Sequence, residues 1–161
     1  MGIYHRDLKL QNVVYLPEQR TAKIIDFGMA TCFPNPEGGM VGSPMFMSPQ
    51  VLSNVKYSHK CDIWSLGVIF YCMVCRSSPY GDQTSPKAIL EQMALIRKQG
   101  VSFPYQLYLS QPCRQVIEGC LQYDEKNRME IDKLLTLPFF SEMEVPEEAL
   151  DYYEPNTTFR P

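Results

Sequence analysis

The side chains of this chain that could do chemistry lie near its start. Asp7, Lys9 and Asn12 place a carboxylate, an amine and an amide within one short stretch, and a second carboxylate follows at Asp26. A carboxylate can accept a proton from a hydroxyl group, and carboxylate and amide oxygens are hard ligands that suit Mg²⁺. Taken singly, an Asp and an Asn so close together more often form a turn. Their order and spacing must therefore decide whether they form a site.

Two short motifs surround these residues. Residues 5–12 read HRDLKLQN, which fits the catalytic-loop pattern H-R-D-L-x-x-x-N of protein kinases at every fixed position, and residues 26–28 read DFG. Three further matches follow in the order that kinases have: GSPMFMSPQ at 42–50, DIWSLG at 62–67, and Asp124 followed by Arg128. The chain therefore resembles a eukaryotic protein kinase over nearly all of its length, but only over the C-terminal lobe of that family's fold.

The resemblance implies a role for each reactive side chain. Asp7 is expected to be the base that accepts the proton of the attacking hydroxyl, and Lys9 the cation on the transferring phosphate. Tyrosine kinases usually have Ala at the position of Lys9, so this residue favours Ser/Thr specificity. Asn12 completes the catalytic set, and with Asp26 it is expected to hold Mg²⁺. The expected ATP site comprises Lys9, Asn12, Val14 and Asp26, with Val14 under the adenine.

Other positions are implied to support this site. In the family, residues like His5 and Phe27 belong to a hydrophobic spine, although Phe27 could equally be plain core. Asp62 is expected to anchor the backbone of the catalytic loop. Ser43 is expected to touch the catalytic Asp and Lys.

The sequence also departs from the family pattern. Gln50 stands where kinases have a Glu that pairs with an Arg such as Arg128, and an amide cannot form that ion pair. We therefore expect the charge of Arg128 to be less compensated. No Ser, Thr or Tyr lies between Thr31 and Ser43, so regulation by phosphorylation of this loop is not expected.

The elements that position the site are expected to be mainly helical. Two short β-like runs at 13–16 and 22–25 flank a turn at 17–20 and predict a hairpin. Residues 31–50 are dense in Pro and Gly, which predicts a long loop without regular structure. Helices are expected from a cap at Asp62 to Cys75, from a cap at Ser85 to residue 99, from Ser110 to Leu121, and from Glu130 to Leu137, ending at Pro138. The predicted fold is mainly α with a small β-hairpin, a kinase-like C-lobe at 1–140 followed by an acidic, flexible tail at 141–161.

Composition narrows the class of protein. The net charge of −3 gives no electrostatic reason to expect a nucleic acid or an anionic membrane as partner. The most apolar stretch, residues 63–75, is shorter than the ~20 residues that span a bilayer, so no membrane segment is predicted. Cys72 and Cys75 form a CxxC inside that stretch and are expected to be core thiols rather than a metal or redox site. No secretory signal begins the chain, so an intracellular, cytoplasmic protein is expected.

Two functions remain open. The first is a Ser/Thr protein kinase that transfers the γ-phosphoryl of ATP to protein Ser or Thr hydroxyls with Mg²⁺. The family also needs a Gly-rich loop, a strand Lys and a helix Glu, and the sequence holds none of them, so we expect the isolated chain to be inactive. The alternative is a non-catalytic, kinase-like binding or scaffold module.

Overall fold

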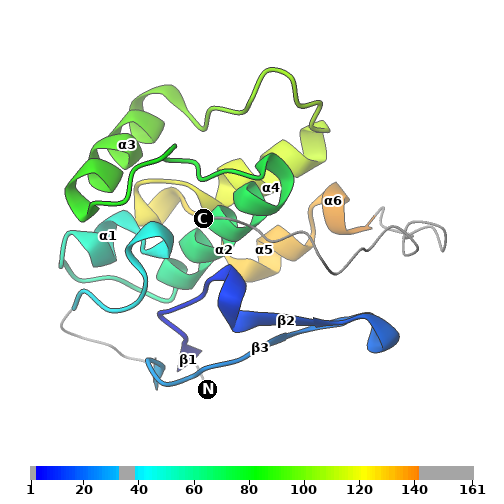
Figure 1. The fold of residues 1–161 in the computed structure, drawn as a ribbon, viewed down its shortest axis with the longest axis horizontal. Helices are drawn as coiled ribbons and strands as arrows, with labels where there is room; N and C mark the ends of the chain where they lie inside the picture. The colour runs from blue at the N-terminus through cyan, green and yellow to red at the C-terminus, as the bar shows by residue number, and fades with distance from the viewer. Residues whose placement is uncertain (1–2, 33–38, 142–161) are drawn as a thin grey trace.

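The computed structural model describes residues 3–32 and 39–141. Helices are its main regular structure, and two small antiparallel sheets lie at one side (Figure 1). The expected fold class, mainly α with a small hairpin, is confirmed. The predicted acidic tail lies outside the described residues, apart from its first position.

The predicted hairpin is present. Strand β2, Val13–Leu16, pairs antiparallel with β3, Thr21–Ile24, and the 3-10 turn η2, Pro17–Gln19, joins them. The second strand lies one residue earlier than predicted. A second sheet pairs β1, Ile3–Tyr4, with β4, Thr31–Cys32. It was not predicted, because two-residue strands are too short to show an alternating pattern.

Helix α2, Lys60–Cys75, runs through the centre of the fold (Figure 1). Trp64, Val68 and Cys72 are at most 1% exposed, so the helix is buried over much of its length. The predicted cap at Asp62 is wrong: the helix begins at Lys60 with His59 at the N-cap position, and Asp62 lies in its first turn. The carboxylate of Asp62 instead bonds to a distant backbone segment.

The next two helices follow their predicted signals. Helix α3, Pro86–Gln99, is capped by Ser85, whose hydroxyl accepts a hydrogen bond from the Ala88 N–H. Helix α4, Gln111–Cys120, is capped in the same way by Ser110. In both helices Pro stands in the first turn. Backbone N–H groups there have no partner within the helix, so the N–H that Pro lacks costs no hydrogen bond.

Proline begins helices elsewhere in ways that the sequence reading did not anticipate. The segment expected to lack regular structure contains β4, the 3-10 turn η3, Pro44–Phe46, and the start of α1, Pro49–Leu52. The last predicted helix ends early: α5 spans Ile131–Leu135, and Pro138 starts a new short helix, α6, Pro138–Ser141. The remaining 3-10 turns are η1, Leu10–Asn12, and η4, Glu125–Asn127.

The cysteines behave mostly as core residues. All six are free, and Cys72 is buried while Cys75 is half-buried, as expected for core thiols. Cys32 is exposed. Within residues 3–32 and 39–141, no helix is both long and apolar enough to cross a membrane.

Close packing of α2 on α4 gives the first prediction. A Cβ added at Gly67 would lie 2.5 Å from the Cβ of Cys120 and 3.0 Å from the Leu121 side chain. We expect Gly67→Ala to lower the free energy of unfolding by about 1–3 kcal/mol, measured by urea denaturation. The steric conflict is expected to outweigh the ~1 kcal/mol that Ala gains over Gly inside a helix.

Gly119→Ala is the matched control on the facing helix. The three atoms nearest to the added Cβ all belong to the flexible side chain of Met129, which can move away. The loss at Gly119 should therefore be clearly smaller. Equal losses at the two sites would mean that the contact with Cys120 is not what limits packing.

Candidate functional site

The backbone of the candidate catalytic loop is fixed by Asp62. Its Oδ2 accepts a hydrogen bond of 2.7 Å from the His5 N–H, and its Oδ1 accepts one of 2.9 Å from the Arg6 N–H. Burial raises the pKa of Asp62, and the two backbone donors act against that rise. Arg6 has a positive φ of 65°, an unusual conformation for a non-glycine residue, which these bonds help to hold.

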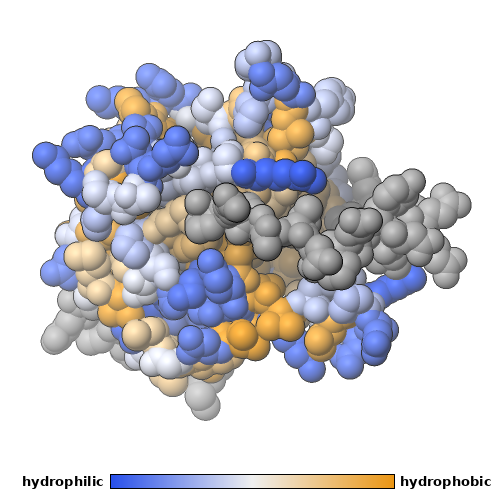
Figure 2. Space-filling model, viewed as in Figure 1, coloured by the Kyte–Doolittle hydropathy of each residue, from blue (hydrophilic) through white to orange (hydrophobic). Residues whose placement is uncertain are grey.

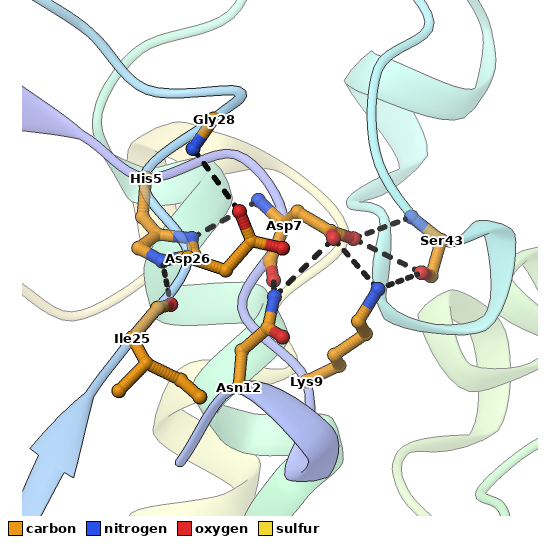
Figure 3. Close-up of polar contacts among 8 residues, drawn as sticks. All are labelled: His5, Asp7, Lys9, Asn12, Ile25, Asp26, Gly28 and Ser43. Carbon is orange, nitrogen blue, oxygen red and sulfur yellow. Dashed lines mark hydrogen bonds and ion pairs between the residues drawn. The ribbon is translucent and has the colours of Figure 1, made fainter.

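Asp7, Lys9 and Ser43 form one hydrogen-bonded cluster (Figure 3). The Lys9 ammonium donates to Asp7 Oδ2 at 2.7 Å and to Ser43 Oγ at 3.1 Å. Ser43 donates to Asp7 Oδ1 from both its backbone N–H, at 2.9 Å, and its hydroxyl, at 3.0 Å. Oδ2 of Asp7 is therefore held by a residue of its own loop, and Oδ1 by a residue 36 positions further along the chain.

This cluster sets the protonation of Asp7. Burial acts to raise the pKa of Asp7, but the hydrogen bonds from Lys9 and Ser43 outweigh it, and the net pKa is lowered. Asp7 is consequently ionised at neutral pH, as a proton acceptor must be.

A pH experiment tests this effect. A carboxylate whose pKa is lower in the folded than in the unfolded state stabilises the fold above its unfolded pKa and loses that contribution as the pH falls through its folded pKa. We expect the difference in unfolding free energy between wild type and Asp7→Asn to shrink as the pH falls below the ordinary Asp pKa of 3.8. Urea titrations at several pH values would show it, and a pH-independent difference would contradict it.

Asn12 lies beside Asp7, and its amide oxygen accepts no hydrogen bond from the described residues. Its side-chain NH₂ donates to the backbone oxygen of Asp7 at 2.9 Å and to Asp7 Oδ2 at 3.3 Å, and the residue is 5% exposed. Within the described part of the chain, no donor is bonded to the amide oxygen of Asn12. That oxygen is available as a hard ligand.

Asp26 is brought close to Asn12 by the backbone. The Ile25 N–H donates to the Asn12 carbonyl at 2.9 Å, so Asp26 directly follows a residue bonded to Asn12. Asp26 has a positive φ of 61°, and its Oδ1 accepts a bond from the Gly28 N–H at 3.2 Å. A carboxylate and an amide oxygen are both ligands that Mg²⁺ takes, together with waters and phosphate oxygens, so Asp26 and Asn12 are the two candidates to hold it.

Of the remaining predicted residues, His5 is buried, whereas Phe27 and Val14 are exposed. His5 bonds through Nε2 to the Ile25 carbonyl at 3.0 Å and meets the Phe27 ring edge to face, with 4.9 Å between centroids. Phe27 itself is 55% exposed, so the alternative of a plain core residue is wrong. Val14 lies on β2 opposite Lys23 and is 39% exposed.

Arg128 is buried without a carboxylate partner, as expected from Gln50. The side chain is 1% exposed, and within the described residues no carboxylate lies within 4 Å of it. Its guanidinium donates instead to Gln50 Oε1 at 3.0 Å and to the carbonyls of Lys60 at 2.7 Å and Gln122 at 3.0 Å. Burial lowers the pKa of Arg128 to about 10. No sequence motif indicates the bonds from Arg128 to the Lys60 and Gln122 carbonyls.

Two further features were missed by the sequence reading. The Arg6 Nε donates to the Met29 carbonyl at 2.6 Å, which ties the catalytic loop to the segment after DFG. A groove of about 960 Å³ also opens beside Lys9 and Asn12. Its walls come from the catalytic loop, residues 43–46, the end of α2, the loop after α2 and one residue of α3, so no contiguous motif marks it.

Fold and site together define a protein kinase C-terminal lobe. The family model of the protein kinase domain matches residues 1–140, and the chain belongs to this family. Its relatives include the human testis-specific serine/threonine-protein kinases 1 and 3, at 36% and 33% identity over 84% and 87% of this chain. The probable serine/threonine-protein kinase fhkC of Dictyostelium discoideum is 33% identical over 95% of it. The chain spans 38%, 52% and 26% of these relatives.

Proposed function

We propose that this chain carries the catalytic residues of a Ser/Thr protein kinase, which transfers the γ-phosphoryl of ATP to Ser or Thr hydroxyls of proteins. The observation that supports it is the cluster of Asp7, Lys9 and Ser43, with Asn12 bonded to it, in a chain of the protein kinase family. A location inside the cell, where thiols stay reduced, fits the free cysteines.

Each residue then has a part in the transfer. The ionised carboxylate of Asp7 orients the substrate hydroxyl and accepts its proton as the oxygen attacks phosphorus. Lys9 is held between Asp7 and Ser43. Its positive charge lies where negative charge develops on the transferred phosphoryl group. Ser43 keeps Asp7 in one orientation, which lowers the entropy that the step must lose.

The nucleotide side of the site rests on Asn12, Asp26 and Val14. The Asn12 amide oxygen and the Asp26 carboxylate would hold Mg²⁺, which supplies charge neutralisation on the nucleotide phosphates when bound. The exposed methyl groups of Val14 would pack under the adenine. The exposure of Val14 and Asp26 leaves both accessible to a nucleotide.

The test is transfer of labelled phosphate from Mg-ATP to protein substrates by the protein isolated from its source cells. We expect Asp26→Asn, expressed in the same cells, to lower the activity by at least about 10²-fold, because it weakens the metal site. Full activity of Asp26→Asn, or phosphate found only on tyrosine, would overturn the proposal. Asp132→Asn, an exposed carboxylate on α5, is the control and should keep full activity.

A second candidate is a non-catalytic binding module, and one observation favours it. Apolar side chains of the hairpin and the DFG segment are unusually exposed: Val14, Tyr15, Ile24, Ile25 and Phe27 are 39–55% exposed. Figure 2 shows apolar side chains gathered low in the view, where the hairpin approaches the helices. Partner binding that is unchanged by Asp7→Asn, together with a wild-type phenotype of that variant, would support this candidate over the enzyme.

A further inference from the structure

We infer that the groove beside Lys9 selects substrate segments in which a large apolar side chain lies next to the phosphoacceptor, and that it disfavours basic side chains there. The inference rests on the proposed function, because it takes Asp7 as the group that meets the phosphoacceptor hydroxyl. Lys9 and Ser43 line the groove and both bond to Asp7. A peptide whose hydroxyl reaches Asp7 therefore lays its neighbouring residues in this groove.

The floor of the groove is apolar. It is lined by Pro44, Met45, Phe46, Cys72 and Ile89. Phe46 is 4% exposed, and Cys72 and Ile89 are each 1% exposed, so the floor is part of the packed core. Burial raises the pKa of Cys72 to about 11, and its thiol is neutral. A side chain that enters the floor meets carbon and an uncharged sulfur, which favours apolar groups.

The rim offers little to a cation. Most of its polar lining is neutral: Gln11, Ser77, Ser78, Gln83 and Thr84. Lys9 is already paired with Asp7, and Asp82 is the single carboxylate among the lining residues, exposed in the loop between α2 and α3. An exposed carboxylate gives weak attraction in water.

Arg76 adds repulsion. It follows α2 in a left-handed conformation with φ 53°, it is exposed, and it lines the same groove. Within the described residues its side chain belongs to no ion pair. A basic side chain placed on the floor would lose hydration with only the exposed Asp82 of the rim as a carboxylate, and it would share the groove with this guanidinium.

The experiment uses peptides with one Ser that differ only in the residues beside it, Leu in one and Arg in the other. Binding to the 161-residue chain is measured by fluorescence anisotropy without nucleotide, and phosphorylation is measured with the protein from its source cells. We expect the Leu peptide to bind at least about tenfold more tightly. Arg76→Glu should reduce this ratio about fivefold, because it replaces repulsion by attraction.

Arg20→Glu is the matched control. Arg20 is also exposed and left-handed, with φ 48°, but it lies at the hairpin turn away from the groove lining. It should leave the ratio unchanged. Equal binding of the two peptides, tighter binding of the Arg peptide, or no detectable binding of either would overturn the inference.

The two readouts separate this inference from the proposed function. Phosphorylation of both peptides at equal rates, lost in Asp7→Asn, would keep the kinase function and reject the groove's preference. The expected binding ratio without any phosphorylation that depends on Asp7 would support the preference and reject the catalytic role.

Discussion

Asp7→Asn is expected to lower the rate of phosphotransfer by about 10²–10⁴-fold and to leave the affinity for ATP within about twofold. Asn has the same shape as Asp, but its single amide oxygen can accept the bonds from Ser43 or the bond from Lys9, not both. It also cannot take up the proton of the attacking hydroxyl. Asp7 is outside the expected ATP-binding set, so ground-state nucleotide binding should persist. Steady-state kinetics with varied ATP, on the protein from its source cells, measure both quantities.

Ser43→Ala separates the proposed role of Asp7 as proton acceptor from the role of Ser43 in positioning Asp7. This variant keeps the carboxylate of Asp7 but removes the hydroxyl that donates to it at 3.0 Å and accepts from Lys9 at 3.1 Å. The backbone N–H of Ser43 still bonds to Asp7. We expect a loss of about tenfold, far smaller than for Asp7→Asn. Similar losses in the two variants would mean that positioning, not proton transfer, dominates the role of Asp7.

Arg128→Ala is expected to lower the free energy of unfolding by about 3–5 kcal/mol. The guanidinium is buried, contacts the face of Trp64 with 5.1 Å to the ring centroid, and satisfies the carbonyls of Lys60 and Gln122. Removing it leaves these acceptors without a donor in the interior and also leaves a cavity. Urea denaturation followed by tryptophan fluorescence would measure the loss, because Trp64 is the single Trp of the chain.

Two further variants identify what Arg128 contributes. Arg128→Lys keeps the charge but cannot reach all the acceptors of the planar guanidinium, so it should show most of the loss. Gln50→Ala removes one acceptor and the 2.7 Å bond from the Gln50 amide to the Tyr123 carbonyl, and it should lose about 1–2 kcal/mol. A stable Arg128→Lys variant would contradict the importance of the guanidinium geometry.

Local sequence signals correctly predicted those structural features that depend only on neighbouring residues. The caps at Ser85 and Ser110 and the hairpin strands at 13–16 are examples, because a cap or a short turn involves groups only a few residues apart. Motif order was enough to identify the family, and the structure gathers Asp7, Lys9, Asn12 and Ser43 into one bonded cluster. The roles of these residues in catalysis remain predictions.

Features that depend on distant contacts could not be predicted locally. The capping rule placed a helix start at Asp62, but its carboxylate is used by backbone groups 56 and 57 residues away. Local rules read Pro44, Pro49 and Pro138 as ends of regular structure, but each begins a helical turn. The groove has no sequence signature, because its lining comes from five separate segments that only the tertiary fold brings together.

The bonds from Asp62 have a consequence for the motions of the loop. The amide hydrogens of His5 and Arg6 point at a carboxylate in the first turn of α2, a helix whose residues are largely buried. These two amides can exchange with solvent deuterium only when that turn opens or the loop leaves it. Their exchange rates should therefore follow those of the first turns of α2 rather than those of the exposed hairpin. We therefore expect the lifetime of this loop's conformation to depend on how long the first turn of α2 stays closed.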